Sequence, residues 1–472
     1  MRRRFLQDIS INSFQIIINQ LCGLIIFYIL SVNLQKTEFG AFNWSLALFL
    51  TVFNILSCGI DQLIVKKIAS GNNSSQLISI YLAHVVMTGL FFYLLLLLSH
   101  SAFHQPHLLL LLGIGKLMIF VSSPFKQLAL GLEKFWSLMF MSICSNVVRS
   151  ILLIIQAIFF DTYLYTIVII FIIGDISELL ICLIITRYKL FIPFHLGGIA
   201  KDYLALIREA IPQMGVVIST SFIARFDWII LGFLTSNVIL AEYSFAYKVF
   251  EISTLPLLVV APVLIPRFTR MFHSRVNLSS KDLLPPIFIL LRFEMIIASL
   301  TGVILNVCWI PVINVISDGK YGTVNHITIL LLSSSLPFLY FNNLLWTINF
   351  SKGYLKLIFK IIGITCIINL AGDIILIPFY LAEGAAAAFL IAMGLQSFMF
   401  LRMIFIKELK HNWYSLIICP FCAIVSVILS VALFINTWIV LLWAILLFFI
   451  FLMISGQLRR SDWAIIKAII VQ

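Results

Sequence analysis

The sequence predicts an all-α polytopic membrane protein with about 14 transmembrane helices. The 472-residue chain is 62% hydrophobic and 11% charged, whereas soluble chains are about 45–50% apolar and about 25% charged. Its mean hydropathy is +1.12, and apolar runs of about 20 residues, long enough to cross a bilayer, recur along it. This composition excludes a soluble enzyme, a secreted domain and a nucleic-acid-binding module, despite the net charge of +12.

Fourteen continuous apolar windows predict the helices in chain order. They cover residues 11–32, 39–60, 79–99, 107–130, 135–160, 164–186, 205–234, 238–266, 285–310, 325–351, 355–378, 380–405, 413–434 and 436–456. Unbroken runs of this length fit helices and not the alternating strands of a β-barrel. The last segment, 463–472, is too short to span and is expected on the membrane surface.

The lysines and arginines predict the orientation of these helices. With the N-terminus inside, Lys36 and Lys320 are the only two of the 31 Lys and Arg residues that fall in outer loops. Most of the others fall in inner segments, as expected for cytoplasmic loops. Both termini are therefore expected in the cytoplasm. Arg2–Arg4 precede a run long enough to span, and no small-residue cleavage site follows, so no cleavable signal peptide is expected.

Two segments separated by 201 residues resemble each other. Residues 30–49 read LSVNLQKTEFGAFNWSLALF, and residues 231–250 read LGFLTSNVILAEYSFAYKVF. Each has an apolar helix end, a polar turn, then a small residue and aromatic residues at matched positions. We therefore predict two six-helix lobes, of helices 1–6 and 7–12, that surround a central cavity. Transporters with parallel repeats carry their substrate path between such lobes.

The predicted lobes cover residues 1–200 and 201–410, and residues 411–472 form an appended helix pair with a short cytoplasmic tail. The sequence contains no phosphate loop, no HExxH motif and no nucleophile elbow, and its predicted outer loops are short. The protein is thus not expected to be an enzyme, and no cofactor or metal is expected. All eight cysteines lie in apolar segments, which favours inert packing.

Several motifs resemble those of polysaccharide-repeat flippases in the multidrug/oligosaccharidyl-lipid/polysaccharide exporter superfamily. The resemblance covers about residues 5–410. It rests on Phe39-Gly40, Arg225-Phe-Asp-Trp-Ile-Ile-Leu-Gly232, Leu240-Ala-Glu-Tyr-Ser-Phe-Ala-Tyr247, Leu264-Ile-Pro-Arg267, Asn369 with Ile377-Pro378, and Glu383-Gly-Ala-Ala-Ala-Ala388. Each motif is short, and their order and spacing together carry the resemblance.

The resemblance implies a flippase that moves a polyprenyl-pyrophosphate-linked oligosaccharide across the bacterial inner membrane by alternating access. The implied substrate is an undecaprenyl-linked repeat unit of O-antigen, part of lipopolysaccharide, or of capsule. Its lipid tail would stay among the membrane lipids. A polysaccharide polymerase and chain-length machinery are the implied protein partners, and no nucleic acid is expected.

Ionisable groups inside a bilayer are costly, so they face the protein interior or water by default. Four basic residues in predicted helices are candidates for a cationic cavity that contacts the headgroup: Arg149, Arg225, Lys248 and Arg292. Arginine suits a pyrophosphate because its guanidinium forms bidentate, charge-assisted hydrogen bonds. For Arg149, Arg225 and Lys248 the alternative is a structural ion pair between or within helices. Arg292 could instead extend its charged end to the membrane surface. Lys116 is expected to be structural.

Acidic and amide side chains leave further alternatives open. Four acids could couple transport to H⁺ or Na⁺, or could instead be charge partners of the basic residues: Asp175, Glu178, Asp227 and Glu251. Polar residues of the first two helices could line the cavity or could bond neighbouring helices. They are Gln15, Asn19, Asn54 and Asp61.

Two other functions compete with a flippase. A cation-coupled multidrug antiporter of the same superfamily would favour an anionic cavity, which the basic residues oppose and the buried acids support. A membrane polysaccharide polymerase or acyltransferase would need a catalytic constellation, and the sequence shows none.

Overall fold

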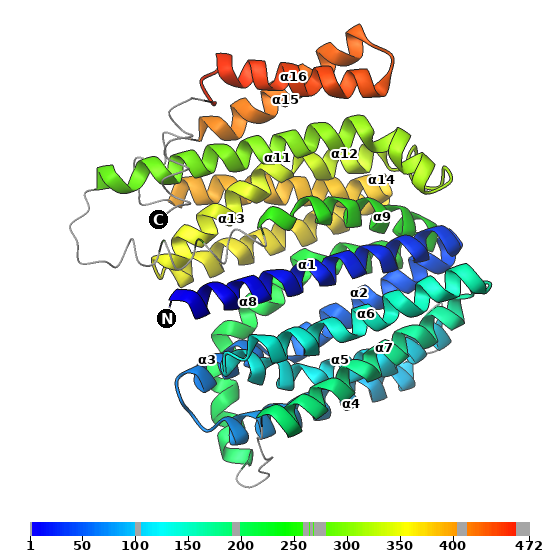
Figure 1. Cartoon of the computed structure of the whole chain (residues 1–472), viewed down its shortest axis with the longest axis vertical. Helices are drawn as coiled ribbons and strands as arrows, with labels where there is room; N and C mark the ends of the chain where they lie inside the picture. The colour runs from blue at the N-terminus through cyan, green and yellow to red at the C-terminus, as the bar shows by residue number, and fades with distance from the viewer. Residues whose placement is uncertain are drawn as a thin grey trace. The chain divides into compact units, whose positions relative to one another are not determined.

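The computed structural model describes residues 2–99, 105–190, 199–257, 264, 268, 280–403 and 413–458. All regular secondary structure in this part of the chain is helical, which confirms the predicted all-α class (Figure 1). The elements are α1 (Arg2–Asn33), α2 (Lys36–Leu56), α3 (Ile60–Ala69), α4 (Ser74–Ser99), α5 (Pro106–Gly131), α6 (Phe135–Phe159), α7 (Leu164–Ile185), the π-helix η2 (Thr186–Leu190), α8 (Ile199–Leu234), α9 (Asn237–Ser253), α11 (Ser280–Ile316), α12 (His326–Ser334), α13 (Leu336–Ser351), α14 (Leu355–Met403), α15 (Tyr414–Leu433) and α16 (Thr437–Ile454).

Twelve stretches of the described helices are long and apolar enough to cross a membrane. The predicted windows 355–378 and 380–405 both fall in α14, a 49-residue element with a non-helical residue, Leu381, inside it. A straight helix of that length would measure about 74 Å, more than twice the hydrocarbon thickness of about 30 Å. The predicted window 238–266 overlaps the 17-residue α9 and continues outside the described residues, where the segment 463–472 also lies.

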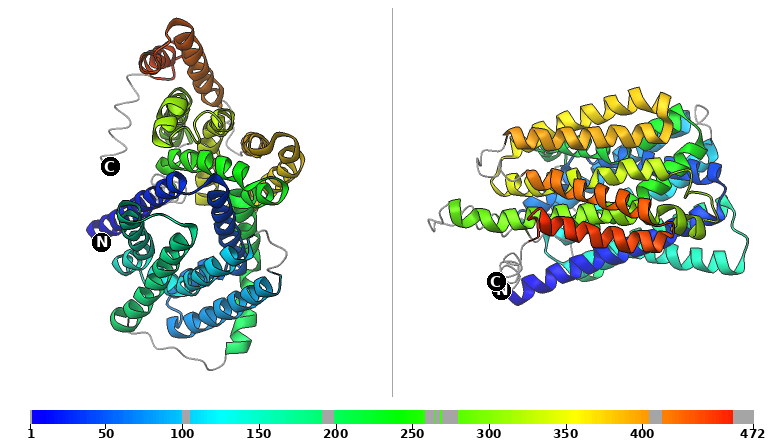
Figure 2. Two further views of the ribbon diagram at one scale, coloured as in Figure 1. Left: turned by 90° about the vertical axis from the view of Figure 1, so that its right-hand side faces the viewer. Right: turned by 90° about the horizontal axis from the view of Figure 1, so that it is seen from above.

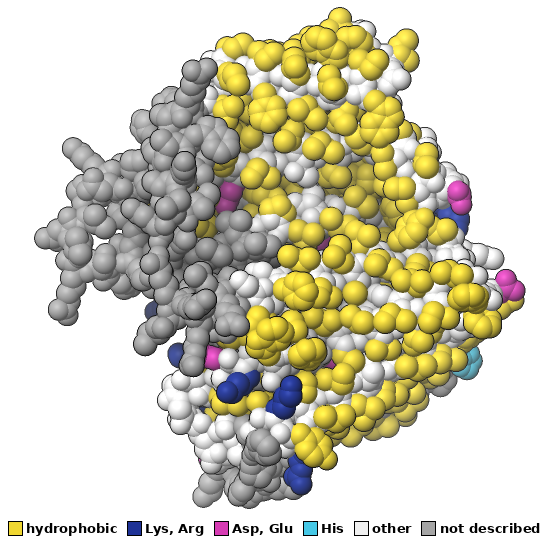
Figure 3. All heavy atoms as spheres, viewed as in Figure 1, with side chains coloured by type: hydrophobic (Ala, Val, Ile, Leu, Met, Phe, Trp, Pro, Cys, Tyr) yellow, Lys and Arg dark blue, Asp and Glu magenta, His cyan; other side chains and the backbone are white. Residues whose placement is uncertain are grey.

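Hydrophobic side chains cover most of the described surface that Figure 3 shows, and charged side chains gather near its margins. Many of the large ones are well exposed, including Leu98, Phe379 and Ile454. Soluble monomers rarely expose apolar patches of such extent. The protein is therefore a multi-pass membrane protein.

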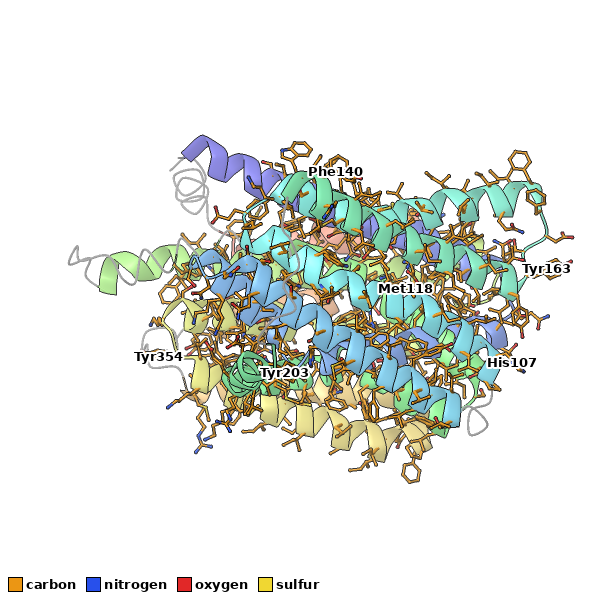
Figure 4. The ribbon with its side chains drawn as sticks, turned by 90° about the horizontal axis from the view of Figure 1, so that it is seen from below. His107, Met118, Phe140, Tyr163, Tyr203 and Tyr354 are labelled. Atoms are coloured by element: carbon orange, nitrogen blue, oxygen red, sulfur yellow. The ribbon has the colours of Figure 1, made fainter. Side chains whose placement is uncertain are left out.

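The chain forms two compact units, Met1–Ala241 and Glu242–Gln472, called here the N-terminal and C-terminal units. In the N-terminal unit, α7 packs against α5 and α6, α6 packs against α1, and α5 packs against α4. Its long helices run along roughly a common direction (Figure 2). His107 and Tyr163 lie at one end of this unit, and Tyr203 lies nearer the other end (Figure 4). The division of the chain into lobes at residue 200 stays a prediction.

A sharp break separates α2 from α3. Cys58 and Gly59 both have positive φ, 52° and 68°, and a Cβ atom on Gly59 would lie 3.0 Å from the backbone of Gln213 in α8. The buried ring of His84 in α4 bonds to the end of α2 and to α8. Its Nε2 lies 2.8 Å from the carbonyl oxygen of Leu56, and its Nδ1 lies 3.0 Å from the hydroxyl of Tyr203 in α8.

These contacts determine the tautomer of His84. A carbonyl oxygen only accepts hydrogen bonds, so Nε2 carries the proton and donates to Leu56. Burial raises the pKa of the Tyr203 hydroxyl, which therefore stays protonated and donates to Nδ1. The ring thus satisfies a carbonyl that the interrupted helix α2 leaves without an intrahelical partner.

Helix α8 lies along α2 and α3 of the same unit. Near its start, Glu209 pairs with Lys67 of α3 at 2.6 Å, and Asp202 accepts a hydrogen bond of 2.5 Å from Gln76 of α4. Near its end, the indole of Trp44 donates to the carbonyl of Ile229 at 3.3 Å. Helix α8 is thus held to the N-terminal unit at both of its ends.

The helix boundaries repeat at the offset found in the sequence. Helix α1 ends at Asn33 and α8 at Leu234, while α2 begins at Lys36 and α9 begins at Asn237. Both pairs of boundaries are separated by the same 201 residues. The two halves of the chain thus make the same helix–turn–helix connection at matched positions.

In the C-terminal unit, α13 and α12 pack against α14, and α15 and α16 pack against each other and against α11. Buried polar groups join some of these helices. Asn342 of α13 donates to the carbonyl of Met393 at 3.0 Å and accepts from Ser397 at 2.8 Å. The helix pair predicted for residues 413–456 corresponds to α15 and α16.

Candidate functional site

Helices α5, α6 and α7 bring five charged side chains together inside the N-terminal unit. Asp175 and Glu178 lie three residues apart on α7, so they share one face of that helix. Lys116 and Lys126 project from α5, and Arg149 projects from α6. Because α7 packs against both α5 and α6, its two carboxylates meet bases from both neighbours.

Asp175 is shared between two bases. The Nζ atom of Lys116 lies 3.1 Å from its Oδ2 and 3.3 Å from its Oδ1. The guanidinium of Arg149 forms an ion pair with the same carboxylate. Asp175 is 1% exposed, so these bases replace the hydration that burial removes.

Glu178 accepts three bonds from the same helices. Lys126 approaches its Oε1 at 2.7 Å, and the hydroxyl of Ser122 donates to that oxygen at 3.1 Å. The hydroxyl of Ser145 in α6 donates to the other oxygen. A buried carboxylate with this many donors is stabilised in its charged form.

Two glycines make room for this network. A Cβ atom on Gly115 would lie 2.5 Å from Oδ2 of Asp175, and one on Gly174 would lie 2.6 Å from Cγ of Arg149. Such distances are too short for a carbon atom. Glycine at these two positions therefore lets α5, α6 and α7 approach closely enough for the ion pairs to form.

The acids and the bases of this network differ in how exposed they are. The carboxylate side chains of Asp175 and Glu178 are 1% and 4% exposed, whereas those of Lys116 and Lys126 are 14% and 22% exposed. Three bases also face two acids in this group. The acids are therefore covered, and the accessible wall of the network presents positive charge.

A cavity of about 600 Å³ lies against this wall. Its volume falls in the range of about 300–1,000 Å³ that is typical of small-molecule sites. Its lining combines charges, amides, hydroxyls and phenyl rings: Asn19, Leu46, Phe49, Leu50, Phe53, Asn54, Ser57, Asp61, Tyr81, Lys116, Ile119, Phe120, Ser123, Lys126, Gln127, Ser142, Ser145, Asn146, Arg149, Phe171 and Glu178. The ring of Phe171 also contacts two bases, at 4.7 Å from Arg149 and 5.3 Å from Lys116.

The structure places some of the predicted site residues at this cavity and others elsewhere. The predicted residues that line it are Asn19, Asn54, Asp61, Arg149 and Glu178. Asn19 accepts a hydrogen bond of 3.0 Å from Asn146, one turn before Arg149 on α6. Asp175 lies behind the wall, and Gln15 is not among the described lining residues.

The other predicted bases lie outside the described lining of this cavity. Arg225 of α8 stacks on the ring of Trp228 at 4.7 Å, and the neighbouring Asp227 is buried and accepts from the backbone of Trp228 at 2.8 Å. Lys248 and Glu251 of α9 form an ion pair of 2.8 Å within one helix. Arg292 of α11 is partly buried.

Lys116 and Lys126 were not among the site residues predicted from the sequence. Lys126 is near the end of a predicted helix, where lysines are common, and Lys116 had no partner in its own helix. Their carboxylate partners are on a different helix. The spacing of Asp175 and Glu178 is the one signal that could have indicated two bases on a neighbouring helix. The described residues contain no group of three or more His, Cys, Asp or Glu residues placed to hold a metal ion.

The sequence profile of the family described as "Polysaccharide biosynthesis protein" matches residues 5–272, more than half of the chain. The chain belongs to this polysaccharide biosynthesis protein family. No curated protein sequence matches it. The family match covers the whole N-terminal unit apart from its first four residues, and therefore all of the cavity described above.

Solved structures show which fold this family member adopts. A lipid II flippase, MurJ, in an inward closed conformation is 14% identical with a TM-score of 0.74, and the match covers 94% of this chain and 98% of that one. A multidrug resistance MATE family transporter of the MOP superfamily, facing inward, is 12% identical with a TM-score of 0.66, over 84% and 95% of the chains. A MOP superfamily transporter from Pyrococcus furiosus, noted for the reverse polarity of its binding pocket, is 12% identical with a TM-score of 0.54, over 84% and 94%. The chain therefore has the fold of the MOP superfamily.

Proposed function

We propose that this protein is a flippase for a polyprenyl-diphosphate-linked oligosaccharide, such as a repeat unit of O-antigen or capsule. The observation that carries the proposal is that Lys116 and Lys126 line the cavity, while the carboxylates they pair with are more buried. Membership of the polysaccharide biosynthesis family supports it. So does the fold that the chain shares with a lipid II flippase.

The chemistry of this substrate fits that wall. A diphosphate keeps its negative charge and would lose its hydration on leaving water, which is costly without compensating donors. Lysine and arginine side chains supply charge-assisted hydrogen bonds to phosphate oxygens. Arg149 would contact the headgroup from the same wall. Arg225, Lys248 and Arg292 remain proposed contacts of the headgroup along its path.

Alternating access would expose the cavity first to the cytoplasm and then to the outer side of the membrane. The coupling ion of this cycle would be H⁺ or Na⁺. The proposed coupling groups are the acids of the transmembrane helices, Asp175, Glu178, Asp227 and Glu251. In this structure Asp175, Glu178 and Glu251 have Arg or Lys partners. Asp227 accepts a hydrogen bond from the backbone of Trp228.

We also propose the bacterial inner membrane as the location of this protein, with both termini in the cytoplasm. The distribution of Lys and Arg along the sequence supports this orientation. The proposed organisation remains two repeated lobes, 1–200 and 201–410, followed by an appended helix pair in 411–472. A polysaccharide polymerase with its chain-length machinery would receive the translocated repeat unit.

A cation-coupled multidrug antiporter is the second candidate, and the carboxylates of Asp61 and Glu178 at the cavity favour it. Glu178, however, is already neutralised by Lys126. The positive wall would repel a cationic drug at the same place. The antiporter hypothesis predicts that neutralising Lys116 improves drug export, whereas the flippase hypothesis predicts that it impairs transport of the lipid-linked sugar.

The test uses the purified protein in liposomes that contain an undecaprenyl-diphosphate-linked oligosaccharide, with a membrane-impermeant lectin to detect sugar that reaches the outer leaflet. We expect Lys116→Gln to slow transport at least about tenfold, since one charge-assisted hydrogen bond is worth that much. Lys66→Gln, an exposed lysine outside the cavity lining, is the matched control. Wild-type protein that moves no lipid-linked sugar, or Lys116→Gln that transports at the wild-type rate, would contradict the proposal.

A further inference from the structure

The break between α2 and α3 places an acid on the wall of the cavity. Asp61 lies in the first turn of α3, directly after Cys58 and Gly59 with their positive φ angles. The close approach of Gly59 to Gln213 and the bond from His84 to Leu56 fix this break on both sides. Asp61 therefore extends from a rigid element, as a residue that recognises a ligand should.

One oxygen of this carboxylate has no partner. Oδ1 of Asp61 is buried and makes no hydrogen bond with any residue that the structure describes. Lys126, a basic residue of the same lining, is engaged by Glu178 at 2.7 Å. Leaving a buried charged acceptor unsatisfied costs free energy. A ligand that brings a hydrogen-bond donor to this point would recover that cost.

The other residues of the cavity lining indicate which kind of ligand would bring this hydrogen-bond donor. Four amide side chains, of Asn19, Asn54, Gln127 and Asn146, line the cavity together with several hydroxyl groups. These groups donate and accept hydrogen bonds in many directions. Phe53 and Phe120 form a stacked pair of rings, 4.7 Å apart with an interplanar angle of 10°. Apolar rings beside amides and a carboxylate match a molecule with C–H groups and a rim of hydroxyls.

We propose that this cavity is a saccharide subsite in which the carboxylate of Asp61 accepts hydrogen bonds from sugar hydroxyls and selects among sugars. The proposal rests on the proposed function, because it assumes that the cargo carries an oligosaccharide. The lysine wall would hold the anionic part of the cargo, and Asp61 would hold a neutral hydroxylated ring. A site that uses a buried acceptor rejects an analogue that lacks the hydroxyl, since the acceptor is then left unpaired.

The test separates sugar recognition from anion recognition by using two probes on the full-length protein in nanodiscs. The first probe is the lipid-free oligosaccharide released by mild acid from the lipid-linked repeat units of the cells that supply the protein. The second probe is inorganic pyrophosphate. Binding of each is measured by calorimetry for the wild type, Asp61→Ala, Asp61→Asn and the control Glu209→Gln, which removes an acid of α8 outside the cavity lining.

We expect Asp61→Ala to bind the oligosaccharide at least about tenfold more weakly, because a hydrogen bond to a charged group is lost. Asp61→Asn keeps one acceptor oxygen and should show a smaller loss. Pyrophosphate affinity should stay within about twofold in both variants, which also shows that they fold. Glu209→Gln should bind both probes as the wild type does.

Three outcomes would overturn the inference. Asp61→Ala that binds the oligosaccharide as tightly as the wild type would remove Asp61 from sugar recognition while leaving the proposed function intact. A loss seen in sodium buffer and absent in choline buffer would assign Asp61 to cation binding. Wild-type protein that binds neither the free oligosaccharide nor its lipid-linked form would count against the proposed function as well.

Discussion

Arg149 of α6 and Asp175 of α7 form an ion pair that is buried inside the N-terminal unit. Lys116 of α5 reaches the same carboxylate, so one acid binds charged side chains from two other helices. Breaking such a pair from one side is costly because the remaining charge stays buried without compensation. The next two predictions follow from this arrangement.

Asp175→Asn should destabilise the protein by about 3–5 kcal/mol, since it leaves Arg149 and Lys116 in the interior without their carboxylate. Thermal unfolding in detergent, followed through the buried cysteines with a thiol-reactive dye, measures the change. The double variant Arg149→Gln/Asp175→Asn should lose less than the sum of the two single variants. Losses that simply add would mean that the two side chains are not energetically coupled.

Gly174→Ala should destabilise the protein by about 1–3 kcal/mol, because the added methyl group would overlap the side chain of Arg149. Gly363→Ala is the matched control, as a Cβ atom at Gly363 of α14 meets no atom within 4 Å. Alanine should stabilise the helix there by up to about 1 kcal/mol. The same unfolding assay compares the two variants, and equal effects would contradict the close contact at Gly174.

His84→Ala should cost about 1–3 kcal/mol, because the carbonyl of Leu56 at the end of α2 would lose its donor inside the protein. Tyr203→Phe removes the second bond to the ring and leaves that carbonyl satisfied. Its cost should be about 0.5–1.5 kcal/mol. If Tyr203→Phe were the more damaging change, the tautomer assigned to His84 would be wrong.

The pair of Lys67 and Glu209 should behave differently from the buried pairs. Its side chains are 27% and 52% exposed, so water screens the attraction and Lys67→Gln should change stability by about 1 kcal/mol or less. The small effect should shrink further when the salt concentration is raised to 1 M, where the Debye length is about 3 Å. A loss that persists unchanged in high salt would indicate a contact other than this ion pair.

Local sequence patterns predicted the helices well, because apolar runs and polar turns are local properties. The turn at Asn33 to Lys36 and its counterpart at Leu234 to Asn237 were found by comparing the chain with itself. The break at Leu381 inside α14 was also visible as a boundary between two apolar windows.

The site was less predictable, because it depends on the register between helices that are far apart in sequence. The sequence placed Arg149, Asp175 and Glu178 inside the membrane and left open whether they were partners. It could not show that Lys116 stands opposite Asp175 and Lys126 opposite Glu178, since that alignment is set by the packing of α5 on α7. Gly115 and Gly174 are the residues that permit this packing, and a glycine in an apolar helix has many other uses.

Helix α8 has a mechanical consequence for the N-terminal unit. It has 36 residues, and Pro212 interrupts its backbone hydrogen bonding directly before the membrane-crossing stretch Gln213–Leu234. Its first turns, tied to α3 and α4 by Glu209 and Asp202, lie before this proline, while Arg225 lies within the spanning part. A proline in a helix interior kinks the helix. The anchored first segment and the segment that carries Arg225 therefore meet at a hinge, where one can tilt without the other.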